Sequence, residues 1–231
     1  MSTVSVVIPC YPPHVKHLPT LLENLKKQTL QPLEVIITAS EMTPDVALTL
    51  YEQLKGILTC PLTLSSTIEV QHAGSNRNRG ADIATGTYVA FMDADDIYHI
   101  QKLELTVLVL DRTGADILVH GFHHGGSLQQ LDTMFEGDKI VVTPSDTILH
   151  ATFGNPPVRD ENERGRNPQT WISVAYRIHH GMPTIRREII KEVRYTDMRY
   201  GEDAMFLRDA LFNYWKQVIA IPEKLMIYTT F

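Results

Sequence analysis

Few cysteines, no long apolar run and no excess of positive charge mark this sequence, and each of these absences excludes a class of protein. Two cysteines, Cys10 and Cys60, among 231 residues are too few for a disulfide framework, so we expect a reducing, cytoplasmic environment. No apolar run approaches the roughly 20 residues that cross a bilayer, and the first residues do not resemble a signal peptide. The net charge of −6 argues against a nucleic-acid-binding protein, which would carry a basic face.

The composition is that of a globular protein, with 43% hydrophobic and 21% charged residues. Short apolar runs, typical of buried strands, alternate with stretches whose apolar residues recur at helical spacing. These runs lie at residues 4–8, 35–37, 62–64, 88–92 and 116–120. Strands that alternate with helices form a mostly parallel sheet with right-handed crossovers, so we predict an α/β fold for residues 1–120. A helix over residues 75–84 is expected to end at Gly86.

The pattern changes after Gly121, because glycine, proline, histidine and charged residues become frequent and the periodicity is poor as far as Thr170. Two helices and two closing strands are then expected, at residues 185–193, 202–215, 218–221 and 225–228. No linker separates the two parts of the chain. We therefore expect a single domain over residues 1–231 with two functional lobes.

Three carboxylates, Asp93, Asp95 and Asp96, follow the apolar run at residues 88–92. Carboxylates this close repel one another, so solvent, a helix N-terminus or a bound cation must offset their charge. Ligands bind at the carboxyl ends of strands in open α/β sheets, and a divalent cation held by one or two carboxylates and substrate phosphates suits such a place. A solvated acidic turn that caps the next helix explains the same residues equally well.

Four motifs, in order along the chain, resemble those of the family 2 glycosyltransferases, which have the GT-A fold. They are Val-Val-Ile-Pro-Cys-Tyr at 6–11, Asn-Arg-Asn-Arg-Gly at 76–80, Ala-Thr-Gly-Thr-Tyr-Val-Ala-Phe-Met-Asp-Ala-Asp-Asp at 84–96 and Gly-Glu-Asp at 201–203. An Asp-x-Asp triplet alone arises often by chance, whereas four ordered motifs argue against chance. The resemblance implies a GT-A fold with a nucleotide-sugar-binding lobe at residues 1–120 and an acceptor-binding lobe at 121–231.

The resemblance also implies that a nucleotide-sugar, with UDP the first expectation, lies across the carboxyl ends of the first strands. Pro9 and Tyr11 match the positions that meet the base, by backbone contact and ring stacking, although Tyr11 alone could be an ordinary loop aromatic. Arg77 matches a basic residue near the diphosphate, and a guanidinium binds phosphate oxygens in a bidentate way. By itself, Arg77 could also be a solvent-exposed arginine at a helix start, which we regard as the less favoured interpretation.

Four further residues carry the chemistry that the resemblance implies. Asp93 matches a carboxylate near the ribose, next to Ala94 in the donor site, and Asp95 matches the metal ligand, with Asp93 as a second candidate. Oxygen ligands select Mn²⁺ or Mg²⁺ rather than zinc. Asp203 is the candidate base that takes the acceptor proton, since it opens a helix whose dipole favours a carboxylate. Without the resemblance, Asp203 would be an ordinary acid of a first helical turn.

The turn after the second strand departs from the family, which usually has an Asp-rich turn there that hydrogen-bonds to the base. This sequence has Thr38-Ala39-Ser40-Glu41 instead. A hydroxyl or a carboxylate can accept a hydrogen bond from a base N–H, so Ser40 and Glu41 are both candidates for that role. The departure leaves the identity of the base open.

Several residues outside the motifs have two interpretations. His120, His123 and His124 could hold zinc, but no fourth ligand follows with convincing spacing. The pairs His179-His180 and Arg186-Arg187 could contact a diphosphate or an acceptor, or could form surface charge. Trp171 could stack on a sugar ring or fill the core.

We therefore predict a metal-dependent, inverting glycosyltransferase that moves a sugar from a nucleotide-diphosphate donor to a hydroxyl of a glycan or another acceptor. The alternative is a catalytically impaired nucleotide- or sugar-binding module on the same fold, which the missing Asp-rich turn favours and which Asp93, Asp95 and Asp203 oppose. A dehydrogenase would need a glycine-rich first turn, which the segment at residues 9–13 lacks.

Overall fold

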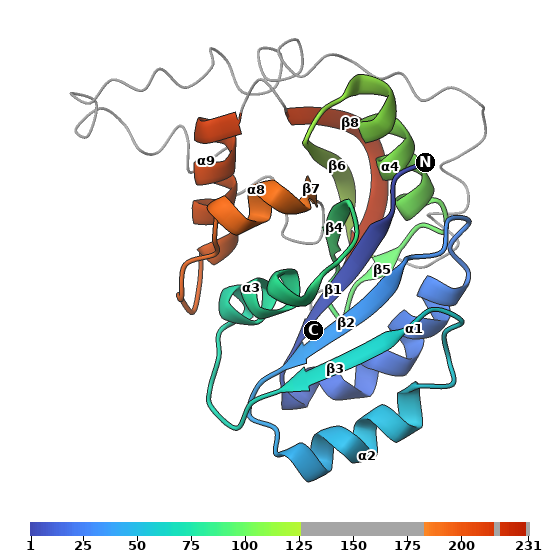
Figure 1. The fold of residues 1–231 in the computed structure, drawn as a ribbon, viewed down its shortest axis with the longest axis vertical. Helices are drawn as coiled ribbons and strands as arrows, with labels where there is room; N and C mark the ends of the chain where they lie inside the picture. Colours follow the sequence, from blue (N-terminus) through green and yellow to red (C-terminus); the bar gives the residue numbers. More distant parts are fainter. Residues whose placement is uncertain (126–182, 215–217, 230–231) are drawn as a thin grey trace, which may run out of the picture.

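The computed structural model describes residues 1–125, 183–214 and 218–229. The strands are β1 (Val4–Cys10), β2 (Glu34–Ala39), β3 (Leu62–Ser66), β4 (Tyr88–Phe91), β5 (Ile97–Tyr98), β6 (Ile117–His124), β7 (Thr184–Arg186) and β8 (Val218–Tyr228). The helices are the 3₁₀ helix η1 (Pro12–His17), α1 (Leu18–Lys26), α2 (Pro44–Leu54), α3 (Ala73–Ile83), α4 (Lys102–Thr113), α8 (Arg187–Glu192) and α9 (Glu202–Tyr214). The strands form one sheet in the order β3-β2-β1-β4-β7-β6-β8-β5 (Figure 1).

The first half of the sheet is parallel, as the alternation of strands and helices predicts. β1 pairs with β2 on one side and β4 on the other, and β2 pairs with β3, all in parallel. Every residue of β1 is buried, which explains why its residues are apolar on both faces except for Ser5, because a strand covered on both faces needs no alternation. β1 also continues through Pro9. β4 pairs with β1 only as far as Val7, so the edge of β1 that faces β4 has no strand partner at Pro9. The missing N–H of the proline therefore costs no hydrogen bond between strands.

The second half of the sheet differs from the sequence-based expectation in two places. Residues 184–186, expected to begin a helix, form β7, which lies between β4 and β6 and is antiparallel to both. The two expected closing strands are one strand, β8, which runs parallel to β6. The register jumps from His120–Ile221 to Gly121–Lys224, so the residues around Pro222 form an irregularity inside the strand, where proline is tolerated.

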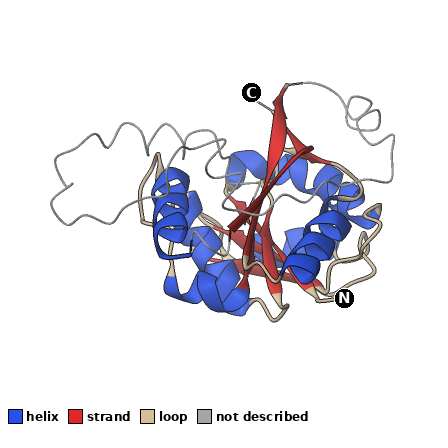
Figure 2. Cartoon of the chain, turned by 90° about the horizontal axis from the view of Figure 1, so that it is seen from above, coloured by secondary structure: helices blue, strands red, loops and turns tan. Residues whose placement is uncertain are grey.

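Helices cover both faces of the sheet (Figure 2). On one face α3 packs against β1 and β2, and α8 and α9 pack against α3. On the other face α4 packs against β6 and α1 contacts β5, while α2 lies beside β3 (Figure 1). The apolar core lies between these layers, and the carboxyl ends of β1, β2 and β4 are left to line a cleft. None of the described helices is both long and apolar enough to span a membrane.

The two glycines that flank the end of α3 are required by close packing. Gly86 was expected to end the helix in a left-handed conformation, but that prediction is wrong: α3 ends at Ile83, and the φ of Gly86 is not positive. A Cβ at Gly86 would lie 2.7 Å from the backbone nitrogen of Ser5. Gly80, inside α3, faces β1 in the same way, so both positions exclude a side chain where this segment crosses the strand.

Replacing Gly80 by alanine would place a Cβ 2.3 Å from Cγ1 of Val7, which is fully buried in β1. We expect Gly80→Ala to lower the free energy of unfolding by about 1–3 kcal/mol, measured by urea denaturation, because helix and strand must separate. Gly56→Ala is the matched control, since a Cβ there meets open space, and it should change the free energy by no more than about 0.5 kcal/mol. Equal losses in the two variants would contradict the packing argument.

Candidate functional site

A cleft of about 580 Å³ opens at the carboxyl ends of β1, β2 and β4. The structure brings together six of the residues singled out in the sequence, which line it: Pro9, Tyr11, Glu41, Arg77, Asp93 and Asp95. Ala94, the other candidate of the acidic turn, is buried and does not line the cleft. The four sequence motifs therefore meet at one place. Two of them contain the carboxyl ends of the neighbouring parallel strands β1 and β4, one lies on α3, and one opens α9.

A buried cation lies at the floor of the cleft. Arg77, on α3, is 1% exposed, and its guanidinium donates to Asp93 Oδ1 over 2.8 Å and to Glu202 Oε1 over 3.2 Å. Its Cζ also lies 5.3 Å from the ring centroid of Tyr195. Burial alone would lower the pKa of Arg77, but Asp93, Tyr195 and Glu202 raise it above its ordinary value, so the group stays charged. Arg77 thus joins the acidic turn to the first turn of α9.

The carboxylates of the acidic turn have different surroundings. Asp93 is bound by Arg77, whereas Asp96 is buried and accepts a hydrogen bond over 3.1 Å from the backbone N–H of Thr229. Burial, reinforced by the charge of Asp93, raises the pKa of Asp96 to about 8. Asp95 keeps a side chain that is 20% exposed in the cleft wall, 3.8 Å from Nε2 of His14. Asp95 is therefore the carboxylate of this turn best placed to meet a ligand.

The residues present fit a divalent cation that a bound substrate completes. Among the residues that the structure describes, no three His, Cys, Asp or Glu side chains converge as a metal cage. Mg²⁺ needs no such cage, because it binds to one or two carboxylates and fills its other positions with water and substrate phosphates. The acidic turn supplies oxygen ligands alone, and the second carboxylate oxygen of Asp96 is buried without a hydrogen-bond partner in the described structure.

The turn after β2 separates its two candidate residues. Ser40 is fully buried, donates its hydroxyl to the carbonyl of Gln71 and accepts from the amide of Asn76, so it belongs to the framework. Glu41 is exposed on the cleft edge, and with a φ of 55° it is the only non-glycine residue of the described part in the left-handed region. Such backbone strain is concentrated at functional sites, which makes Glu41 the better candidate for a ligand contact.

The start of α9 contributes two acids with different partners. Glu202 lines the cleft, is 8% exposed and is held by Arg77. Asp203 is half-buried, is not among the residues that line the cleft, and its charge raises the pKa of Tyr195 and Tyr228, although burial is the larger cause for both tyrosines. Asp203 directly follows Glu202, which lines the cleft, in the first turn of α9.

Several lining residues were not singled out in the sequence, among them His14, His72, Arg199, Tyr200 and Tyr228. They come from η1, from the loops before α3 and α9, and from the end of β8. None belongs to a motif, and only Tyr228 lies in a predicted element, the strand at 225–228, so the sequence carried no signal that they line a cleft. Tyr200, 75% exposed, and Arg199 stand on the cleft edge, with the guanidinium 5.4 Å from the ring centroid.

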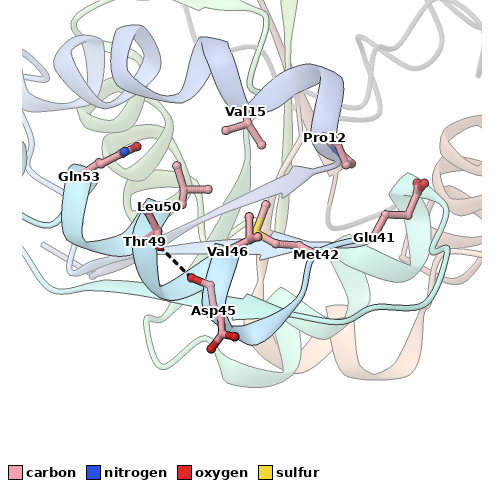
Figure 3. Close-up of a pocket in the computed structure, with 9 residues that line it drawn as sticks. All are labelled: Pro12, Val15, Glu41, Met42, Asp45, Val46, Thr49, Leu50 and Gln53. Carbon is pink, nitrogen blue, oxygen red and sulfur yellow. Dashed lines mark hydrogen bonds between the residues drawn. The ribbon is translucent and has the colours of Figure 1, made fainter.

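A second hollow, of about 550 Å³, lies on the other side of Glu41 (Figure 3). Its walls are mainly apolar and come from η1 and α2, with Val15 facing Leu50 across the space and Asp45 at the edge (Figure 3). Glu41 borders both hollows. Glu41 therefore stands where the two hollows meet.

Among the side chains that the structure describes, His120 and His123 belong to no group of three potential zinc ligands, and the side chain of His124 lies outside that part. His120 is buried, and its Nδ1 lies 2.7 Å from the carbonyl of Gly121, so Nδ1 carries the proton and Nε2 accepts from Lys102 Nζ at 2.8 Å. Arg186 pairs with Asp116, away from the cleft. Arg187 donates to the carbonyl of Ala84. The residues at 171 and 179–180 lie outside the described part.

Solved structures with the same arrangement define the class of the fold. The chain superposes on TarS of S. aureus in complex with UDP with a TM-score of 0.67 and 19% identity, covering 99% of this chain and 60% of that one. It superposes on glucosyl-3-phosphoglycerate synthase of Mycobacterium tuberculosis, in complex with Mn²⁺, UDP and glucosyl-3-phosphoglycerate, with a TM-score of 0.63 and 14% identity, covering 100% and 73%. The fold is the GT-A fold of glycosyltransferases, as the motifs predict.

The family follows from the sequence comparison. The model of glycosyl transferase family 2 matches residues 5–194, so the chain belongs to this family. Among curated relatives, the amylovoran biosynthesis glycosyltransferase AmsB of Erwinia amylovora is 38% identical over 114 residues, which cover 47% of this chain and 36% of that protein. The glycosyltransferase EpsJ of Bacillus subtilis is 24% identical over 97% of this chain and 60% of its own length. The chain thus spans between about a third and three fifths of these two relatives.

The ion pairs of Arg77 should be worth much to stability, because both carboxylates are nearly buried. We expect Arg77→Met to lower the free energy of unfolding by about 3–5 kcal/mol in urea denaturation, since it leaves two buried charges uncompensated. Arg194→Met is the control: Arg194 forms an ion pair with Asp82 in which the two side chains are 34% and 57% exposed, so about 1 kcal/mol at most is expected. A smaller loss for Arg77→Met than for Arg194→Met would refute the central role of this cation.

Proposed function

We propose that this protein transfers a sugar from a nucleotide-diphosphate donor, with UDP as the expected nucleotide, to an acceptor hydroxyl with inversion at the anomeric carbon. The observation that carries the proposal is the acidic turn: Asp95 faces the cleft, while Arg77 binds the neighbouring Asp93. Membership of glycosyl transferase family 2 and the UDP bound to TarS support a nucleotide-sugar donor. The lobes at 1–120 and 121–231, for donor and acceptor, stay a proposal, as does the predicted cytoplasmic location.

In the donor complex, Asp95 would hold a Mn²⁺ or Mg²⁺ ion, with Asp93 as a second candidate ligand. Such an ion, when bound, neutralises the charge that grows on the leaving diphosphate. The Mn²⁺ and UDP in the M. tuberculosis synthase support this assignment. Arg77 contributes by fixing Asp93 and by offsetting the negative charges of Asp93 and Glu202, which would otherwise repel the diphosphate.

The nucleotide base would lie against Tyr11 and the backbone at Pro9, with Glu41 accepting a hydrogen bond from a base N–H. Tyr11 is 41% exposed at the cleft edge, and its ring centroid lies 4.3 Å from that of His14, which supports its orientation. Glu41 stands where the family usually places an Asp-rich turn, and its carboxylate offers the same acceptor chemistry.

Asp203 would take the proton of the attacking hydroxyl. The neighbouring Glu202 is less suited to this role, because it is ion-paired to Arg77. Protonating Glu202 would remove one of the two carboxylates that pair with this buried guanidinium. Asp203 lies in the first turn of α9, where helix N–H groups favour an anion. A single displacement with a base on the acceptor side inverts the anomeric carbon.

Removing the carboxylate of Asp95 should abolish metal-dependent nucleotide binding. We expect Asp95→Ala to raise the dissociation constant of UDP in Mn²⁺ by at least about tenfold in calorimetric titration, while metal-free UDP binding changes little, because only the metal contact is lost. Asp82→Ala, which removes an exposed carboxylate on α3, is the control. If the parent binds none of UDP, GDP and dTDP, with or without Mn²⁺, the donor proposal fails and a non-catalytic module is favoured.

Asp203→Asn should separate binding from transfer. We expect the variant to bind donor nucleotide within about twofold of the parent and to lose transfer by at least about 100-fold, the lower end of what a general base contributes. The measurement is product formation from a radiolabelled nucleotide-sugar panel with hydroxyl acceptors. Asp209→Asn, further along α9, controls for charge on the helix. Parental transfer by Asp203→Asn would show that the base lies elsewhere.

A further inference from the structure

The end of β8 returns to the acidic turn. β5, which follows the turn directly, pairs with β8 in antiparallel fashion, with Tyr98 opposite Met226. Two residues beyond Met226, Tyr228 lines the cleft, and Thr229 follows it. A segment more than 130 positions away in sequence therefore closes the turn that carries the candidate metal ligand.

Thr229 makes two hydrogen bonds to this turn. Its backbone N–H donates to Oδ1 of Asp96 over 3.1 Å, and its hydroxyl donates to the backbone carbonyl of Asp95. The second contact restrains the peptide plane that follows the Cα of Asp95, and so limits the backbone conformations from which that carboxylate projects. Neither contact uses the carboxylate of Asp95, which stays directed at the cleft.

The other side of the turn is held from within the core. The N–H of Asp93 donates to the hydroxyl oxygen of Tyr98 over 2.7 Å. Tyr98 is fully buried, and Nζ of Lys102, itself held by His120, lies 4.7 Å from its ring centroid. With this side anchored in the core, the half-exposed Thr229 holds the turn from the opposite side, while the carboxylate of Asp95 lies 3.8 Å from Nε2 of His14.

We propose that Thr229 is a positioning residue for the acidic turn, and that its hydroxyl orients Asp95 toward a divalent cation shared with a nucleoside diphosphate. The inference rests on the proposed function, since it takes Asp95 as the metal ligand. Groups that hydrogen-bond a metal-bearing segment without touching the metal typically change its affinity 10–100-fold. Thr229 acts in the same way, through the backbone of Asp95.

The test is calorimetric titration of the full chain with the nucleoside diphosphate, among UDP, GDP and dTDP, that the parent binds in Mn²⁺, repeated without metal. Thr229→Val removes the hydroxyl but keeps the branched shape and the N–H, and we expect about tenfold weaker binding in Mn²⁺ with metal-free binding unchanged within about twofold. Thr229→Ser, which keeps the hydroxyl, should restore parental affinity. Thr113→Val is the matched control, because its hydroxyl also donates to a backbone carbonyl, that of Val109, far from the cleft.

Parental Mn²⁺-dependent affinity in Thr229→Val would overturn the inference. So would equal losses with and without metal, or a Thr229→Ser variant as weak as Thr229→Val, since those results describe a general structural role. If Thr229→Val does not fold, judged by far-UV circular dichroism, Thr229→Ala takes its place with the same expectation. If the parent binds no nucleotide in Mn²⁺, the proposed function and this inference both fail. If the parent binds a nucleotide in Mn²⁺ and Thr229→Val binds it with the same affinity, this inference alone fails.

Discussion

The cleft depends on one buried guanidinium. Arg77 joins Asp93, which follows β4, to Glu202, which opens α9, although these two acids lie 109 positions apart in the sequence. Placing three ionised groups where water is scarce costs solvation energy, which their mutual attraction repays only with good geometry. The close packing of Gly80 against Val7 keeps α3, and Arg77 with it, at the required distance from β1.

The acids of the cleft also differ in the groups that bind them. Arg77 binds Asp93 and Glu202, and the N–H of Thr229 binds Asp96 deep in the turn. Asp95 is left facing the cleft, where a cation arriving with a substrate finds an oxygen ligand. An acidic triplet that looks like a simple cluster in the sequence is therefore three groups with three surroundings.

The fold could be predicted largely from the sequence, because buried parallel strands have unbroken apolar runs that need no tertiary information. β7 could not, since Thr184–Arg186 is too short to show a strand pattern and is defined only by its neighbours β4 and β6. At the site, the motifs indicated which residues meet. They could not show that Arg77 is fully buried, that Ser40 belongs to the framework or that Thr229 reaches the acidic turn, because those facts depend on packing between distant segments.

The place of β7 has a consequence for the modularity of the chain. The motif-bearing segment before residue 125 ends its parallel sheet at β4, and the next strand beside β4 comes from residues 184–186. A fragment cut after residue 125 would leave the backbone N–H and C=O groups on one edge of β4 unpaired, and that edge could pair with a strand of another molecule. A chain in which only the later half was exchanged would therefore have to supply a matching antiparallel strand beside β4.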